Sequence, residues 1–172
     1  MRRESGVGLV EILVVLVIAG ILITAGVVFA MPWLSREEMR GAVYTVQEHL
    51  QLARIQAVTR NRACQFRLNA STGLVQVIDL NDPANGTDDT EITHVTLSRS
   101  ISFSDPGGGS AITLQLISGT LYQATFEADG SVSAGAGVIN LLGGDRYDRV
   151  SVLGAGGTKT ENWNGSVWQW GA

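Results

Sequence analysis

The sequence is poor in the residues on which many folds and active sites depend. It contains a single cysteine, Cys64, so no internal disulfide can form, and the simplest expectation for Cys64 is a small buried apolar side chain. Charged residues make up only 16% of the 172 positions. The formal net charge of −4 argues against a broad nucleic-acid-binding surface, although it leaves room for a small local basic patch.

Motifs of the common enzyme classes are missing as well. The two histidines, His49 and His94, have no cysteine or carboxylate at metal-ligand spacing. The sequence contains no Gly-x-Ser-x-Gly nucleophile elbow, and the glycine-rich stretches 107–109 and 154–157 lack the lysine and the following helix of a phosphate-binding loop. We therefore expect a protein that is not an enzyme and that has no cofactor and no metal.

Clustered acids leave one alternative for a metal. Asp145 and Asp148, together with Asp129 or Asp88–Asp89, could supply oxygen ligands to calcium, a hard cation that takes carboxylates and loop carbonyls. Solvated loop charges are the simpler interpretation.

One long apolar stretch dominates what is present. Ile12–Met31 holds twenty residues without a charge, which as a helix would extend about 30 Å, the thickness of a bilayer's hydrocarbon core. The stretch is longer than the core of a cleaved secretory signal and is followed by a poor match to its cleavage site, which favours a retained span. Arg2 and Arg3 precede it, so the positive-inside rule predicts a cytoplasmic N-terminus. Glu11 lies at the edge of this span, where an ionised carboxylate without a partner is costly and therefore indicates function.

The helical pattern continues beyond the apolar stretch. Apolar residues recur at steps of three and four over Met39–Ala57 with charged residues between them, which predicts an amphipathic continuation and a single helix over about 8–60. Pro32 predicts a kink or local break, and Ser35 with Glu38 has capping-box spacing if the helix restarts there. An isolated amphipathic helix gains too little to stay folded, so its apolar stripe must lie on a sheet.

Short runs of strand-forming residues separated by turn signals follow the helix and predict an antiparallel sheet. The expected strands are Arg62–Leu68, Leu74–Leu80, Ile92–Leu97, Ala111–Ile117, Leu121–Phe126, Val138–Leu142, Arg149–Leu153, Thr158–Trp163 and Ser166–Trp170. Asn81–Asp89 and Gly143–Asp148 are expected as loops, and Asn164-Gly165 is a strong hairpin signal.

The stretch from Gly6 to Glu11 and the apolar span after it resemble the class III leader and N-terminal segment of type IV pilins and type II secretion pseudopilins. This resemblance implies that a prepilin peptidase cuts after Gly6 and methylates the new N-terminal amine of Val7. It also implies that Glu11 pairs with the N-terminal amine of a neighbouring subunit during assembly. Such a pairing is physically sound, because a buried carboxylate is stabilised only by an opposite charge.

The remainder of the chain is similar to GspH/FimT-like minor pseudopilins. The resemblance rests on Arg60-Asn-Arg62 with Ser71-Thr-Gly73, on Thr125–Gly130, and on Arg149–Val152. It implies an α+β, type IV pilin-like fold in which one long N-terminal helix, transmembrane in its first half and amphipathic in its second, packs on an antiparallel β-domain.

The same resemblance implies a division of the chain and a function. Residues 1–6 would be the leader, 7–32 the transmembrane and assembly helix, and 33–172 the amphipathic helix with a periplasmic β-rich domain. The chain would be a minor pseudopilin of a type II secretion system, held in the bacterial inner membrane by a single pass. Its partners would be other pilin or pseudopilin subunits, the prepilin peptidase and the inner-membrane assembly platform.

An alternative function is a FimT-like minor type IV pilin that binds DNA for uptake. Arg146, Arg149 and Lys159 would then contact phosphates. Because Asp145 and Asp148 lie among them, local salt bridges are the simpler expectation. A third alternative, a signal-anchored periplasmic binding module unrelated to filaments, would require the leader-like motif to be a coincidence.

Three tryptophans lie close to the C-terminus. Trp168 and Trp170 are two residues apart on one expected strand, so they share a face, and Trp163 lies on the strand before it. They either cap the core of the sheet, the favoured interpretation, or form an exposed aromatic patch for a partner.

Overall fold

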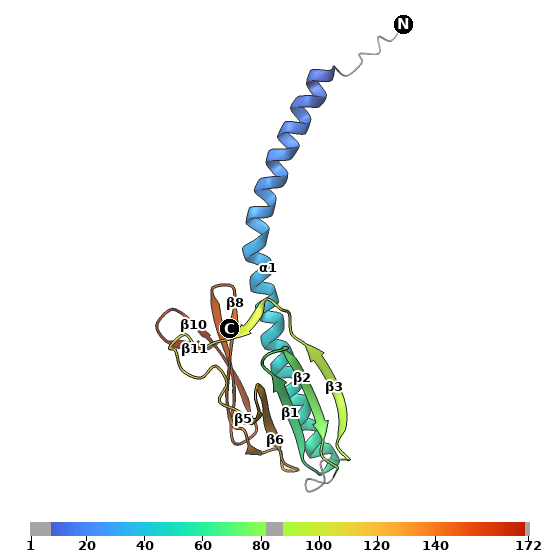
Figure 1. Ribbon diagram of the computed structural model, residues 1–172, viewed down its shortest axis with the longest axis vertical. Helices are drawn as coiled ribbons and strands as arrows, with labels where there is room; N and C mark the ends of the chain where they lie inside the picture. The colour runs from blue at the N-terminus through green and yellow to red at the C-terminus, as the bar shows by residue number, and fades with distance from the viewer. Residues whose placement is uncertain (1–7, 82–87, 171–172) are drawn as a thin grey trace. The chain divides into compact units, whose positions relative to one another are not determined.

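A computed structural model of the chain describes residues 8–81 and 88–170. The chain divides into two compact units, Met1–Ser35 and Arg36–Ala172. Helix α1 runs without interruption from Leu9 to Arg60 (Figure 1), which confirms the predicted single long helix. Of the kink or local break predicted at Pro32, the break is wrong, and Ser35 caps no new helix. One lost backbone hydrogen bond costs less than ending a helix and nucleating another.

The part of α1 that lies in the first unit bears many large apolar side chains that are exposed in this chain. They are Leu9, Val10, Ile12, Leu13, Val14, Val15, Leu16, Val17, Ile18, Ile21, Leu22 and Ile23, followed by Trp33 and Leu34. Across residues 8–81 and 88–170, no helix meets the length and hydropathy needed to cross a membrane. The division into a leader (1–6), a membrane segment (7–32) and a domain (33–172) stays a prediction.

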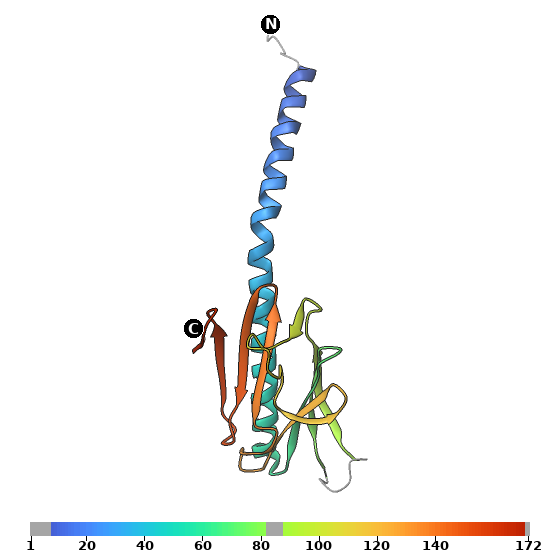
Figure 2. The same ribbon diagram turned by 60° about the vertical axis from the view of Figure 1, so that its left-hand side comes forward.

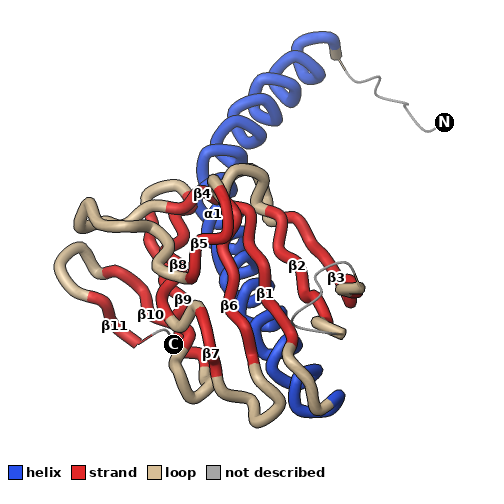
Figure 3. The backbone as a smooth tube through the Cα atoms, turned by 60° about the horizontal axis from the view of Figure 1, so that its bottom comes forward, coloured by secondary structure: helices blue, strands red, loops and turns tan. Residues whose placement is uncertain are grey.

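The second unit contains two antiparallel sheets (Figures 1 and 3). Sheet A contains, in spatial order, β3 (Thr90–Thr96), β2 (Leu74–Asp79), β1 (Cys64–Asn69), β6 (Leu121–Phe126) and β5 (Gln115–Ser118), and β7 (Val132–Ala134) also pairs with β6. Sheet B contains β11 (Trp168–Trp170), β10 (Thr158–Trp163), β9 (Arg146–Val152), β8 (Gly137–Gly143) and β4 (Ile101–Phe103).

The strands depart from the sequence pattern in three places. β4 and β7 are not among the expected strands, because three residues are too few to show a period. The expected strand Ala111–Ile117 is wrong in its first half, where Ile112 forms only an isolated bridge to Ile139. The expected loop Gly143–Asp148 is mostly paired, since β8 ends at Gly143 and β9 begins at Arg146.

One apolar core joins α1 to both sheets. Figure 2 shows the lower part of the helix running along the strands, and the buried stripe on α1 is Met39, Ala42, Val46, Leu50, Ala53 and Ala57. Phe66 and Phe126 from sheet A and Ile139 and Val150 from sheet B meet this stripe in the same cluster. The predicted amphipathic half of the helix is therefore confirmed, with its apolar side against the sheets.

A buried carboxylate fixes the end of the helix to sheet A. Asn61 adopts a left-handed conformation with φ of 51°, and the N–H of Arg62 donates to the carbonyl of Ala57 at 3.1 Å, which ends the helix. This turn directs Arg60 and Arg62 to Asp79, a residue of β2 with no exposed surface. The Nη2 of Arg62 lies 2.5 Å from Asp79 Oδ2, and Arg60 Nη1 donates to the same oxygen.

Cys64 is fully buried beside this carboxylate, as expected for a small apolar side chain. Burial, with the nearby charge of Asp79 as a second cause, raises the pKa of the Cys64 thiol to about 11. The thiol therefore stays protonated at neutral pH, where a thiolate would be the reactive form.

Candidate functional site

The predicted assembly residues lie at the start of α1. Gly6 and Val7, the predicted processing site, lie outside the described residues. Glu11 occupies the first turn of the helix, where its N–H donates to the carbonyl of Gly8 at 3.0 Å and its side chain is exposed. A carboxylate in a first turn interacts favourably with the helix macrodipole. Its exposure among apolar side chains leaves it accessible to a group from another chain.

Strand alternation divides sheet B into a face that packs on α1 and an outer face. Val150 of β9 is in the core and pairs with Thr160 of β10, so Thr160 shares the helix-facing side. Arg149, one residue before Val150, therefore lies on the outer face, as does its β10 partner Glu161. Trp170 pairs with Glu161 and belongs to this outer face too.

All three C-terminal tryptophans lie on this outer face. Trp163 and Trp168 are paired across β10 and β11, with ring centroids 5.3 Å apart and ring planes tilted by 59°. Both are half-buried, whereas Trp170 is 75% exposed, and none belongs to the hydrophobic core. The favoured interpretation that they cap the core is wrong, because the register directs them away from the helix. A contact with a partner stays a prediction.

Two of the predicted cations stack on these tryptophans. The guanidinium of Arg149 lies 3.9 Å from the ring centroid of Trp168, and Lys159 Nζ lies 4.1 Å from that of Trp170. Such placements are favourable cation–π contacts, stronger where the cation is partly desolvated.

Both stacked cations also have a carboxylate partner. Arg149 Nε donates to Asn140 Oδ1 at 2.7 Å, and its Nη2 lies 3.4 Å from Asp105 Oδ1. Lys159 Nζ donates to Glu161 Oε1 at 2.6 Å. The charge of each cation is thus offset within the chain.

Arg146 does not join the other two cations. It lies three residues before Arg149 on β9 and hence on the helix-facing side, where its Nε donates to both carboxylate oxygens of Asp148 at 3.1 and 3.2 Å. The alternative that Arg146, Arg149 and Lys159 form one basic patch therefore does not fit this arrangement. The local salt bridges that were the simpler expectation are present, but for Arg149 and Lys159 the acids are Asp105 and Glu161.

The acids considered for calcium are dispersed. Within residues 8–81 and 88–170, no group of three or more His, Cys, Asp or Glu side chains is arranged to hold a metal ion. Asp148 pairs with Arg146, and Asp89 pairs with Arg67 at 3.3 Å. Asp129 accepts hydrogen bonds from the hydroxyl and N–H of Ser131, which lower the pKa of its carboxyl.

The two histidines have ordinary local partners. His49 Nδ1 lies 2.8 Å from the carbonyl oxygen of Thr45, one turn earlier on α1. His94 Nδ1 lies 2.5 Å from Glu91 Oε1, and this hydrogen bond lowers the pKa of the exposed Glu91 carboxyl. Neither histidine contributes to a catalytic arrangement among the described residues.

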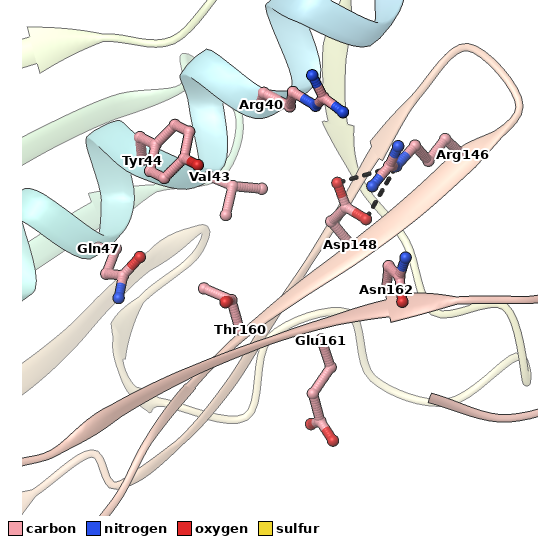
Figure 4. Close-up of a pocket in the computed structure, with 9 residues that line it drawn as sticks. All are labelled: Arg40, Val43, Tyr44, Gln47, Arg146, Asp148, Thr160, Glu161 and Asn162. Atoms are coloured by element: carbon pink, nitrogen blue, oxygen red, sulfur yellow. Dashed lines mark hydrogen bonds and ion pairs between the residues drawn. The ribbon is translucent and has the colours of Figure 1, made fainter. Parts of the chain in front are cut away.

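A cavity of about 230 Å³ lies between α1 and the helix-facing side of β9 and β10 (Figure 4). Its lining residues are Arg40, Val43, Tyr44, Gln47, Arg146, Asp148, Thr160, Glu161 and Asn162. No pattern in the sequence predicts this cavity. The helical spacing of Arg40, Tyr44 and Gln47 places them on one side of α1, so the sequence could have indicated the wall that the helix contributes. The wall formed by β9 and β10 depends on how these strands pair, which the sequence does not specify.

Comparisons with known proteins agree with this architecture. A family model described as "Type II transport protein GspH" matches residues 42–156, and one described as "Prokaryotic N-terminal methylation motif" matches residues 1–27. No curated protein sequence matches the chain significantly.

Two solved structures share the fold. The type IV minor pilin FimU of Pseudomonas aeruginosa is 14% identical with a TM-score of 0.52, covering 77% of this chain and 93% of that one. The minor pseudopilin EpsH from the Type 2 Secretion System of Vibrio cholerae is also 14% identical with a TM-score of 0.52, covering 72% of this chain and 95% of that one. At this identity the likeness concerns the fold alone.

Proposed function

Because the chain belongs to the family of type II transport protein GspH, we propose that it serves a type II secretion system as a minor pseudopilin. The family and the fold make it a minor pseudopilin or minor pilin, a structural subunit and not an enzyme. The observation that carries the finer proposal is the family match over residues 42–156. Such a subunit is processed by a prepilin peptidase and assembles with other pilin-like subunits.

The proposed mechanism begins at the N-terminus. The methylation-motif match over residues 1–27 supports cleavage after Gly6, methylation of Val7, and retention in the inner membrane with the β-domain in the periplasm. The exposed apolar side chains from Leu9 to Ile23 support packing against neighbouring helices once the subunit leaves the lipid. Glu11 would then pair with the N-terminal amine of a neighbour on the inner-membrane assembly platform.

Substitution of Glu11 tests this proposal. We expect Glu11→Ala to remain in the membrane fraction at normal levels but to enter filaments on the order of a hundredfold to a thousandfold less, because breaking a buried charge pair costs about 3–5 kcal/mol. The measurement is the ratio of subunit in sheared filaments to subunit in membranes, together with secretion. Glu37→Ala, at an exposed acid further along the same helix, is the matched control and should assemble normally. Normal assembly of Glu11→Ala would contradict the pairing.

One observation favours the alternative of DNA binding. Arg149 and Lys159 lie with Trp168 and Trp170 on one open face, and cations with aromatic rings are the usual means of holding single strands. We nevertheless expect no salt-sensitive DNA binding by the full chain in detergent, because both cations are already paired with acids. A gel shift at low and moderate salt checks this. Binding that is lost in Arg149→Gln and Lys159→Gln would establish the alternative.

A further inference from the structure

The cavity between α1 and sheet B has an unbalanced set of charges. Arg40 and Arg146 both line it, and Figure 4 shows their side chains pointing toward each other from the helix and from β9. Of the two acids in the lining, Glu161 points away from the cavity, and its carboxylate pairs with Lys159 on the outer face (Figure 4). Asp148 alone faces these two cations, which leaves one positive charge in excess.

The arginines retain free donors in this arrangement. Arg40 is exposed and takes part in none of the ion pairs formed by residues 8–81 and 88–170. Within the same part of the chain, Arg146 donates only through Nε, to Asp148, which is 5% exposed. The Nη groups of both guanidiniums can therefore bind a second carboxylate, and the planar fork of arginine favours that anion geometrically.

The size of the cavity limits the ligand. Its volume of about 230 Å³ is below the roughly 300–1,000 Å³ of sites that enclose drug-sized molecules. Val43 and the ring of Tyr44 line the helix side and offer an apolar contact to a short methylene stem. Thr160 and Gln47 supply neutral hydrogen-bonding groups. A glutamate or aspartate side chain fits these features, with its stem on Val43 and Tyr44.

We infer that this cavity binds one carboxylate group, carried by an acidic side chain of a partner protein, between the guanidiniums of Arg40 and Arg146. Asp148 holds Arg146 in place through its Nε, and Arg40 supplies the charge that the described residues leave unbalanced. The inference concerns the chemistry of one cavity and does not depend on which secretion or pilus system the chain serves.

The test uses the full ¹⁵N-labelled chain in a non-ionic detergent and follows the arginine Nε–H resonances by NMR. The probe is the peptide acetyl-Gly-Glu-Gly-amide, and acetyl-Gly-Gln-Gly-amide is its neutral match. We expect the acidic peptide alone to shift the resonances of Arg40 and Arg146 in a saturable manner. Propionate tests a free carboxylate and should bind clearly more weakly, because it lacks the stem and backbone of a peptide.

Two variants distinguish binding in this cavity from the general attraction of anions to exposed arginines. Arg40→Gln should weaken the acidic peptide about tenfold or more, whereas Arg36→Gln, which removes an exposed arginine one turn earlier on α1, should change it less than about twofold. Arg146 is left intact, because its removal would bury an unpaired Asp148. Equal responses to both peptides, equal losses in the two variants, or propionate binding as tightly as the peptide would each overturn the inference.

Discussion

At the residue scale, Asp79 has the most unusual environment among the described side chains. Its carboxylate has no exposed surface, yet its two partners, Arg60 and Arg62, keep 38% and 39% of their side-chain surface exposed. The arginines could return to water if the acid were removed, but the acid could not reach water if the arginines were removed. The two halves of this ion pair should therefore differ in their effect on stability.

We expect the double substitution Arg60→Gln and Arg62→Gln to lower the free energy of unfolding by about 3 kcal/mol or more, because it leaves a buried carboxylate uncompensated. Asp79→Asn should cost less, about 1–2 kcal/mol, because it removes the charge and keeps an acceptor for the arginines. Urea denaturation of the full chain followed by circular dichroism measures both. A larger loss in Asp79→Asn than in the double variant would contradict this assignment of roles.

Some of these residues could be predicted and others could not. The burial of Cys64 follows from the apolar character of a single free cysteine, and the place of Glu11 at the start of α1 follows from its position just before the apolar stretch. The convergence of Arg60 and Arg62 on Asp79 has no sequence signal, because it depends on a left-handed residue at Asn61 and on the position of β2. The periodicity of apolar residues predicts individual helices and strands, whereas a contact between side chains of two such elements can be known only from the folded structure.

At the scale of elements, α1 carries the clearest agreement between sequence and structure. Over the second unit its period of three and four places a buried stripe along one side of the helix, with half-buried and exposed positions around the rest. Leu50 has no exposed surface, whereas Ile55, five residues later, is 58% exposed. The helix therefore provides a pair of apolar side chains with the same number of carbon atoms that differ chiefly in burial.

We expect Leu50→Ala to lower the free energy of unfolding by about 2–5 kcal/mol, since it leaves a cavity between the helix and both sheets. Ile55→Ala, the matched control, should change it by less than about 1 kcal/mol, because its side chain is already in contact with water. The urea concentrations at the unfolding midpoints of the two variants measure this difference. Similar losses in both would show that α1 does not pack on the sheets through the Leu50 side.

The tryptophan hairpin shows where element-level prediction ends. The sequence places Trp168 and Trp170 on one face of a strand, and the structure confirms that they share a face. Which face it is depends on the register of β11 on β10 and of β10 on β9. Since Glu161 pairs with both Arg149 and Trp170, the tryptophans share the side away from the core. The sequence contains no signal that fixes the register of these strands.

At the scale of the whole molecule, the α+β architecture could be predicted, but the organisation of the β-domain into two sheets could not. The alternation of apolar and polar residues predicts where strands lie in the chain, but it does not predict which strands pair. β4 is followed in the chain by β5 of sheet A, yet pairs with β8 of sheet B, so the chain passes between the sheets more than once. Both sheets nevertheless share one core with α1, which implies that they unfold together.

Tryptophan fluorescence can report on this coupling. Trp163, Trp168 and Trp170 all lie in sheet B, and a Trp33→Phe background removes the fourth tryptophan, which lies on the first part of α1. In this background, Phe66→Ala removes a fully buried ring from sheet A. If one core joins the sheets, this change should shift the fluorescence transition of sheet B as far as it shifts the circular dichroism of the whole chain.

The expected shift corresponds to about 3–5 kcal/mol, the usual cost of truncating a buried phenylalanine. Leu116→Ala, which shortens a side chain that is 55% exposed on β5 of the same sheet, is the control and should leave both transitions nearly unchanged. A fluorescence transition that stays in place while the circular dichroism splits into two steps would mean that sheet B unfolds independently of sheet A. Coincident transitions would instead mean that the two sheets, which share one apolar core with α1, unfold as a single cooperative unit.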